Sequence, residues 1–342
     1  MAGQTHMRME IEEIPDATRR LLADSADQLR AAGEALRVRK PVMVATIARG
    51  SSDHASSFLK YAIELVAGIP VASIGPSIMS IYGRELQLAG CAAIAISQSG
   101  KSPDAVAMEQ SARRNGALCI ALTNTPASPL AASADLAVDL RAGVETSVAA
   151  TKTFVSSVVA GLSVLGHWTG DAALLSSIEA LPDAFRKAVT RDWTPLMAAL
   201  KGRNSLYVLG RGPALAIAQE AALKFKETCG MHAEAYSAAE VLHGPARIVE
   251  EGFPVLALAS RDAGEAGVAE IVDRLARQGA AAFATTERAK QATRLPFVET
   301  GHPITDALPL IVSFYAFVEM LSRYRGFDPD HPPHLKKVTE TV

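Results

Sequence analysis

The sequence lacks the features that mark several large classes of protein. Its 342 residues include only three cysteines, Cys91, Cys119 and Cys229, too widely spaced for a disulfide framework or a metal cluster. Charged residues make up 20% of the chain, with a net charge of -2 and no basic run that could follow a nucleic-acid backbone. Glycine, proline or charged residues interrupt every apolar run well before the length of a membrane span. We therefore expect no nucleic-acid partner, no membrane segment and no metal.

We expect no export signal at the N-terminus. The stretch from Met1 to Glu13 contains acidic residues and lacks the apolar core segment of a signal peptide. Hydrophobic residues make up 49% of the chain, which is enough for two ordinary domains. We expect a cytoplasmic, globular protein.

Strand-like apolar runs recur in two halves of the chain. Residues 42–48, 92–96 and 118–122 of the first half correspond to residues 206–209, 255–258 and 281–284 of the second. In each half the first run leads into a glycine turn and a helical stretch, a pattern that specifies a doubly wound parallel sheet. The sequence predicts an α/β fold of two tandem, flavodoxin-like domains related by a pseudo-twofold axis.

The predicted organisation has five segments. Residues 1–30 form a helical segment, 31–170 a first domain with a phosphate site, and 171–200 a helical connector. Residues 201–325 form a second domain with catalytic residues, and residues 326–342 form a tail that closes over the site.

A serine-rich turn follows the apolar run 92–96. Pro103 stands where a helix can begin just after this turn. Hydroxyls and backbone N–H groups at a helix N-terminus hold an oxyanion, because the helix dipole favours negative charge there. The alternative is an ordinary serine-capped helix. The polar members of the turn are Ser97, Gln98, Ser99 and Ser102.

The second half has a different turn at the corresponding place. Residues 259–264 carry Asp262 where the anion would lie, and its charge would repel a phosphate in a partly desolvated pocket. We expect one phosphate site per chain, in the first half.

A series of short motifs, in order along the chain, resembles the SIS (sugar isomerase) family. The likeness is to stand-alone SIS-type glucosamine-6-phosphate deaminases and to the isomerase part of glucosamine-6-phosphate synthase (glutamine–fructose-6-phosphate transaminase). The motifs are RGSSDH at 49–54, SQSG at 97–100, VAATK at 148–152, GRG at 210–212, LKFKE at 223–227, HAEAY at 232–236, EVLHGP at 240–245 and LKKVT at 335–339.

This resemblance implies a sugar-phosphate site without a cofactor. The phosphate would be held by Ser97, Gln98, Ser99 and Ser102. Ser52 would bind a sugar hydroxyl, and the remaining substrate-binding residues would be Val148, Ala150, Thr151 and Lys224. The resemblance also implies Glu227 as the base that moves a proton between C1 and C2, His243 as the ring-opening residue, and Lys337 from the tail. In the synthase the histidine comes from the neighbouring subunit, so we expect a homodimer with shared sites.

The residues by themselves leave alternatives open. Glu227 follows apolar helical positions that suit a partly desolvated base, but it also has the spacing of a surface ion pair with Lys224. His243 on a Gly-Pro turn suits proton transfer, or is simply solvated. Lys337 would neutralise an enolate or form a Schiff base, or is a solvated charge. Glu145 either accepts loop N–H bonds or contacts substrate.

The sequence also departs from the synthase. No cysteine follows Met1, and we expect no glutamine-hydrolysing domain. Ala150 stands where the synthase has a serine, and Lys101 stands where it has an acidic residue. We therefore expect conversion of glucosamine 6-phosphate and water to fructose 6-phosphate and ammonia. The alternatives are a fructosamine-6-phosphate deglycase, a galactosamine-6-phosphate deaminase, a glutamine-independent synthase, and a non-catalytic sugar-phosphate sensor.

Overall fold

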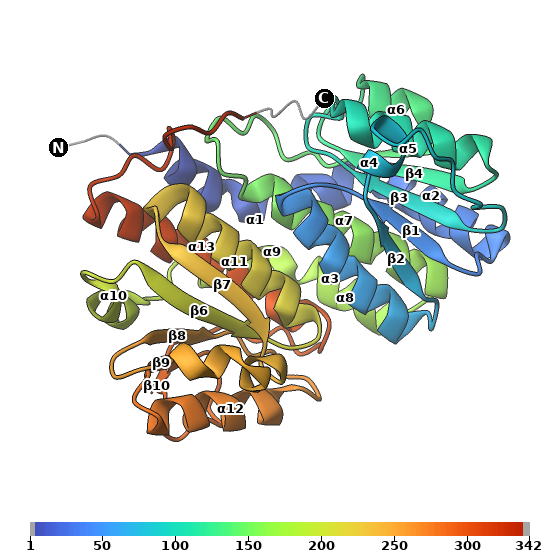
Figure 1. Ribbon diagram of the computed structural model, residues 1–342. Coiled ribbons are helices and arrows are strands. Elements are labelled where there is room, and N and C mark those ends of the chain that lie inside the picture. The colour runs from blue at the N-terminus through green and yellow to red at the C-terminus, as the bar shows by residue number, and fades with distance from the viewer. Residues whose placement is uncertain (1–3, 338–342) are drawn as a thin grey trace. The chain divides into compact units, whose positions relative to one another are not determined.

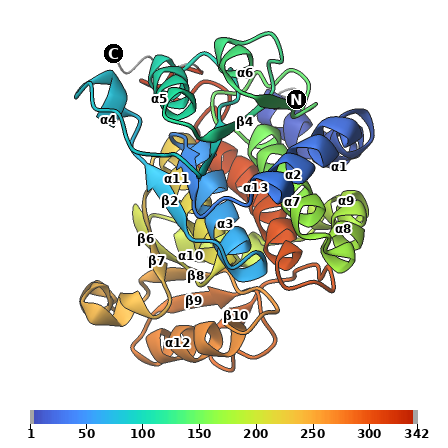
Figure 2. The same ribbon diagram turned by 90° about the vertical axis from the view of Figure 1, so that its right-hand side faces the viewer.

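Two five-stranded parallel sheets form the centres of two compact units (Figures 1 and 2). The computed structural model describes residues 4–337. Residues 14–145, 152–179 and 336–337 make up what we call the N-terminal-sheet unit. Residues 4–13, 146–151 and 180–335 make up the C-terminal-sheet unit.

The N-terminal sheet has its apolar strands at the centre. Its strand order is β2-β1-β3-β4-β5, and every pairing is parallel. The central strands are buried along their whole length because helices cover both faces of the sheet. The strands are β1 (Val44–Ile47), β2 (Val71–Ile74), β3 (Ala92–Ile96), β4 (Leu118–Thr123) and β5 (Leu136–Asp139).

The helices of this unit form one layer on each face of the sheet (Figure 1). One layer contains α2 (Ala26–Arg39), α3 (Ser51–Val66) and α7 (Lys152–Thr169), with α8 (Ala172–Glu179) packed on α7. The other contains α4 (Ser77–Ser80), α5 (Pro103–Arg114) and α6 (Pro129–Ser133). The first helix of the chain, α1 (His6–Asp24), has its first residues in the C-terminal-sheet unit. The core beneath α5 is built from alanine, isoleucine, cysteine and methionine side chains, including Met108 and Cys119.

The C-terminal sheet has the order β10-β9-β8-β6-β7. Its strands are β6 (Ser205–Gly210), β7 (His232–Ser237), β8 (Pro254–Ala257), β9 (Ala281–Ala284) and β10 (Thr293–Arg294). The α-helices are α9 (Leu181–Ala188), α10 (Thr194–Leu200), α11 (Pro213–Cys229), α12 (Glu265–Arg277) and α13 (Leu308–Tyr324). Three short 3-10 helices complete it: η1 (Glu240–His243), η2 (Pro245–Ile248) and η3 (Thr305–Ala307).

The two units repeat the same topology. Read from β6, the second sheet places its strands as the first does from β1: the second strand on one side, the third and fourth on the other. The turns after β1 and β6 are also alike, because Gly50 (φ 59°, ψ -134°) and Gly212 (φ 58°, ψ -137°) both precede the first helix of their unit. Only glycine adopts this conformation without strain. The predicted fold of two tandem doubly wound parallel sheets is confirmed.

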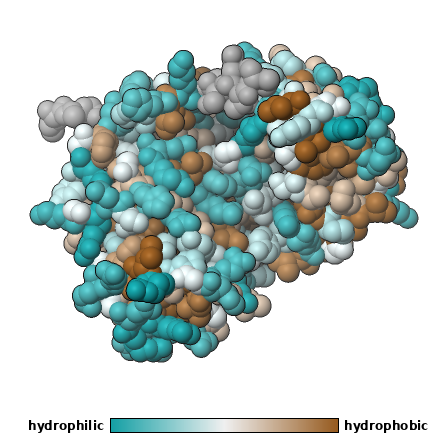
Figure 3. All heavy atoms as spheres, in the orientation of Figure 1, coloured by the Kyte–Doolittle hydropathy of each residue, from teal (hydrophilic) through white to brown (hydrophobic). Residues whose placement is uncertain are grey.

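The most apolar helical segment lies in the interior. Thr305–Tyr324 is long and apolar enough to cross a membrane, but 94% of its apolar window is buried inside the structure. Phe314 and Phe317 of α13 pack against Phe225 of α11, with ring centroids 5.0 and 6.5 Å apart. In the face shown in Figure 3, apolar residues are scattered among hydrophilic ones. This segment is therefore a core helix of the C-terminal-sheet unit.

Candidate active site

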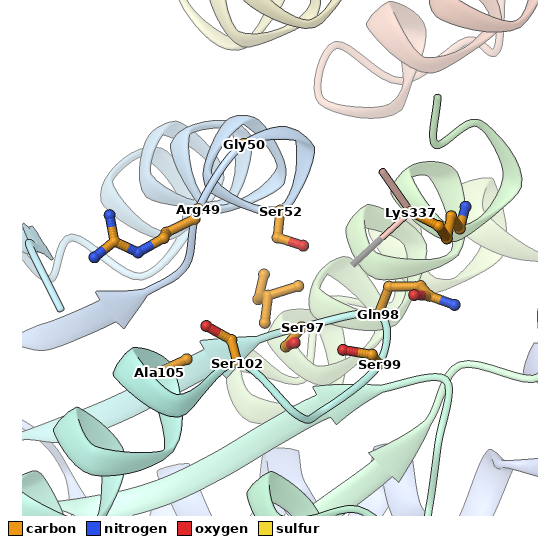
Figure 4. Close-up of a pocket in the computed structure, with 10 residues that line it drawn as sticks. Arg49, Gly50, Ser52, Ser97, Gln98, Ser99, Ser102, Ala105 and Lys337 are labelled. Atoms are coloured by element: carbon orange, nitrogen blue, oxygen red, sulfur yellow. The ribbon is translucent and has the colours of Figure 1, made fainter. Parts of the chain in front are cut away.

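A cavity of about 360 Å³ opens in the N-terminal-sheet unit, at the carboxyl ends of β1 and β3 (Figure 4). The strand order reverses between these two neighbouring strands, which is where open α/β sheets bind their ligands. The cavity is lined by Arg49, Gly50, Ser52, Ile96, Ser97, Gln98, Ser99, Ser102, Ala105 and Lys337. The structure thus brings together Ser52, the four polar residues of the serine-rich turn and Lys337 at one cavity.

Backbone donors fix the hydroxyls of the serine-rich turn. The Oγ of Ser97 accepts the N–H of Gly100 at 3.2 Å, and the Oγ of Ser99 accepts the N–H of Lys101 at 3.3 Å. A hydroxyl that accepts a backbone N–H still has its own proton to donate. The turn therefore presents oriented O–H donors to a ligand in the cavity.

Gly100 allows this turn to close. Its φ is +61°, and a Cβ at this position would lie 2.0 Å from the Oγ of Ser128 and 2.9 Å from the Oγ1 of Thr123. The N–H of Leu130 also donates to the carbonyl of Gly100 at 3.1 Å. A side chain at position 100 would push the turn away from α6, so glycine is required by both backbone angle and space.

Two helices point their N-termini at the cavity. Gly50 and Ser52 line it from the start of α3, and Ser102 and Ala105 line it from the start of α5. Ser102 is the N-cap of α5, yet its side chain makes no cap hydrogen bond. Ser102 thus stands at the cap position without the hydrogen bond that an ordinary serine cap makes. Two positive helix ends and oriented hydroxyls can hold a tetrahedral oxyanion.

Two cationic side chains border the cavity, and each has an acidic partner. Arg49 pairs with the buried carboxylate of Asp104, and its own side chain is 42% exposed. Lys337 places its Nζ 2.9 Å from the Oε2 of Glu145. The sequence analysis assigned no role to Arg49. Its position just before the glycine turn that follows β1 could have indicated that it lies at the cavity. Figure 4 shows Arg49 and Lys337 at opposite sides of the serine cluster.

Glu145 is a buried carboxylate that organises the start of α7. Its Oε1 accepts the N–H of Thr153 at 3.1 Å, and its Oε2 accepts the Thr153 hydroxyl at 2.7 Å. Of the two roles left open for Glu145, the structural one is therefore present. The same carboxylate also holds the ammonium of Lys337 at the cavity.

Glu227 lies near the end of α11, in the C-terminal-sheet unit. Its side chain is 21% exposed and pairs with Lys224, which is fully buried. Lys224 also contacts the buried Glu220 at 3.3 Å, and the hydroxyl of Tyr315 donates to Glu220 at 3.1 Å. Burial by itself would lower the pKa of Lys224, but the charges of Glu220 and Glu227 outweigh it and raise that pKa. The ion pair between Glu227 and Lys224, which the sequence offered as a surface alternative, is present, but its lysine is fully buried.

The burial of Lys224 affects whether it can contact substrate, which is the role predicted for it. None of its side chain is exposed, and its ammonium is occupied by two carboxylates. A substrate in solvent would meet Glu227 first. The geometry fits Lys224 as the residue that holds Glu227 in place.

The other predicted site residues lie in the C-terminal-sheet unit. His243 ends η1 and is exposed, and Gly244 after it has a φ of +145°. Thr151 is fully buried, Ala150 is half-buried, and the N–H of Val148 donates to the carbonyl of Asp330 at 3.4 Å. The backbone N–H of Val148 is thus already used within its own unit.

Comparison with known proteins gives a family match over most of the chain. A model described as the SIS domain matches residues 38–165 and 199–316. The chain is 34% identical over 361 residues to the glutamine–fructose-6-phosphate aminotransferase (isomerizing) of Pyrobaculum aerophilum. That alignment covers 99% of this chain and 58% of the relative, so the chain spans little more than half of that protein's length.

Solved structures agree with this match. A provisionally assigned phosphosugar isomerase from Silicibacter pomeroyi DSS-3 is 54% identical, with a TM-score of 0.93 over 96% of this chain and 100% of that one. The C-terminal domain of glucosamine-fructose-6-phosphate aminotransferase from Francisella tularensis has the same fold, with a TM-score of 0.83 at 24% identity over 97% and 99% of the two chains. The family model matches more than half of the chain, and each matched segment contains one of the two parallel sheets. The chain therefore belongs to the SIS domain family.

Proposed function

We propose that the protein is an aminosugar-phosphate isomerase and deaminase that converts glucosamine 6-phosphate and water to fructose 6-phosphate and ammonia. The cavity of oriented serine hydroxyls at two helix N-termini is the observation that carries this proposal. Such a cavity suits a phosphate monoester, and the family includes proteins named for phosphosugar and aminosugar chemistry. The phosphate would anchor the substrate, and the reacting carbons would lie at its other end.

The reaction needs one proton acceptor that reaches two adjacent carbons. After ring opening, the C2 proton leaves to a carboxylate, the electron pair forms a C1–C2 double bond, and the negative charge moves to the aldehyde oxygen, giving an enolate-like intermediate. Protonation of that oxygen gives an enolamine. Return of a proton at C1, with loss of a proton from the nitrogen, gives an imine at C2, and water then hydrolyses the imine to a ketone and ammonia. Each step balances without a redox cofactor or a metal.

Glu227 is the proposed base. It is an acceptor with part of its side chain exposed, and Lys224 fixes it from inside the protein. His243, exposed on a turn, is proposed to assist ring opening. Lys337, held by Glu145, is proposed to supply positive charge to the enolate-like intermediate. We further propose a cytoplasmic homodimer in which His243 completes the neighbouring subunit's site.

The test is ammonia release from glucosamine 6-phosphate, measured together with fructose 6-phosphate formation. The wild type should form both products in equal amounts, and Glu227→Gln should lower kcat at least about 100-fold because the proton acceptor is lost. The exposed Glu270→Gln on α12 is the control and should keep full activity. Failure of the wild type to release ammonia from this substrate would refute the deaminase proposal.

The reverse reaction is the second candidate. The 34% identity to a protein named for aminotransfer to fructose 6-phosphate favours it, because the same proton transfer serves both directions. Incubation with fructose 6-phosphate and a high concentration of ammonium salt should give glucosamine 6-phosphate if this direction operates. A forward rate without any measurable reverse product would reject it.

A further inference from the structure

We propose that Arg49 is a positioning residue that neutralises Asp104, so that the cavity accepts the full double charge of a phosphate monoester. The inference rests on the proposed function, because it concerns how the same cavity selects its ligand. It begins from an acidic residue in an unexpected place. Asp104 is 1% exposed and lies in the first turn of α5, between the cavity-lining Ser102 and Ala105.

Asp104 competes with an anionic ligand for the same helix end. A carboxylate in the first turn interacts favourably with the positive end of a helix, as a bound phosphate would. Two negative groups at one helix terminus repel each other, and the burial of Asp104 reduces the solvent screening between them. An uncompensated Asp104 would therefore weaken the binding of a phosphate at the serine-rich turn.

Arg49 supplies the compensating charge. Its guanidinium pairs with the Oδ2 of Asp104, and its side chain also lines the cavity. The pair connects the turn after β1 with the start of α5, which form two walls of the cavity. In Figure 4 the guanidinium of Arg49 points away from Ser97 and Ser99. The geometry therefore assigns Arg49 to Asp104 and leaves the hydroxyls and backbone N–H groups to the ligand.

Charge compensation and direct contact with the phosphate predict different affinities for the double variant Arg49→Gln/Asp104→Asn. If Arg49 acts through Asp104, Arg49→Gln should weaken the binding of fructose 6-phosphate at least about tenfold. Asp104→Asn alone should strengthen it at least about threefold, and the double variant should return to within about threefold of the wild type. If Arg49 instead touches the phosphate, the double variant should bind as weakly as Arg49→Gln.

A second readout separates charge from folding. Fructose 6-sulfate has the shape of the phosphate ester but one negative charge fewer near neutral pH. The ratio of phosphate to sulfate affinity should fall in Arg49→Gln and recover in the double variant, whereas general damage to the cavity weakens both ligands alike. Arg49→Lys keeps the charge and should retain most of the ratio.

The experiment is isothermal titration of these variants with fructose 6-phosphate, fructose 6-sulfate and fructose. Arg113→Gln is the matched control, since Arg113 forms a similar pair with Asp135 at 2.8 Å and does not line the cavity. Asp104→Asn binding more tightly and a restored double variant are the expected results. Unchanged binding in Asp104→Asn, or a double variant that binds as weakly as Arg49→Gln, would overturn this inference and leave the proposed function standing. No binding of fructose 6-phosphate by the wild type would overturn the proposed site itself.

Discussion

Two serine hydroxyls at the cavity, those of Ser97 and Ser99, are oriented by backbone N–H donors and keep their own protons for a ligand. Ser97 and Ser99 accept backbone N–H groups, and Ser102 caps its helix by position but not by hydrogen bond. This arrangement limits the entropy that a ligand must overcome, because the hydroxyls are already oriented. Preorganisation of this kind predicts that small changes in the turn affect binding more than they affect folding.

Gly100→Ala tests the turn. The new Cβ would meet the Oγ of Ser128 at 2.0 Å and would place alanine at a φ of +61°, so the turn must shift. We expect at least about tenfold weaker binding of fructose 6-phosphate by calorimetry. Gly90→Ala is the control, because Gly90 also has a positive φ, +80°, but open space around it. Equal losses of binding in both variants would contradict this account.

Glu109 gives a pH dependence to stability. Burial raises the pKa of Glu109 to about 7, although Ser133 donates a hydrogen bond to it. The folded state therefore binds this proton more tightly than the unfolded state, so the stabilisation is complete below about pH 4.5 and is lost as the pH rises through about 7. Relative to wild type, Glu109→Gln should gain on the order of 2–3 kcal/mol between pH 5 and pH 8.

The measurement is urea unfolding of both proteins at each pH. Glu270→Gln, an exposed change on α12, should follow the wild type throughout. A difference between Glu109→Gln and wild type that stays constant from pH 5 to pH 8 would show that Glu109 is ionised in the folded protein.

At the scale of elements, α7 depends on a side chain outside the helix. Glu145 accepts both the N–H and the hydroxyl of Thr153 and also holds Lys337. Glu145→Ala should cost about 1–3 kcal/mol in the free energy of unfolding, because a buried N–H and a hydroxyl lose their acceptor. It should also lower kcat, since Lys337 loses the carboxylate that positions it. Thr153→Ala is the matched variant, and it should lower stability with a smaller effect on kcat.

Sequence reasoning identified the central strands and missed the outer ones. β1, β3, β4, β6, β8 and β9 coincide with apolar runs because central parallel strands are buried on both faces. The edge strand β7 has one fully buried residue, Ala233, and β10 has two exposed residues, so neither matches an apolar run. Their positions come from pairing with neighbouring strands, which a single sequence does not reveal.

The candidate site was predictable where a local motif sufficed. The serine-rich turn was identified from its own sequence, whereas Lys337 was implied only by the family resemblance. The structure places the four polar residues of the turn and Lys337 on one cavity. The pairs Arg49 with Asp104 and Glu145 with Lys337 join residues 55 and 192 positions apart. Such contacts depend on the tertiary fold, so no spacing rule could have indicated them.

On the scale of the whole chain, the two halves share one topology, but their corresponding turns carry different side chains. The serine-rich turn of the first half corresponds to residues 259–264 of the second, where Asp262 accepts the N–H of Gly264 at 2.7 Å. Arg261 there pairs with Asp306 and lies 4.0 Å from the ring of Phe297. An ion pair and an internal hydrogen bond thus occupy this turn, and we expect the phosphate to bind in the first half.

The assignment of the phosphate site to the first half of the chain is testable. Replacing Ser97 and Ser102 with alanine should weaken sugar-phosphate binding at least about tenfold, because two hydroxyl donors are lost. Ser260→Ala, in the corresponding turn of the second half, should leave binding unchanged. Binding affinities measured by calorimetry check this, and a loss of binding in Ser260→Ala would mean that the second half also contributes to the phosphate site.

A crystal structure of the protein with fructose 6-phosphate would test the central claim most directly. The account predicts the phosphate group in the cavity of the N-terminal-sheet unit, with oxygens about 2.5–3.0 Å from the hydroxyls of Ser97, Ser99 and Ser102. A sugar phosphate bound elsewhere on the chain, with this cavity filled only by water, would contradict it.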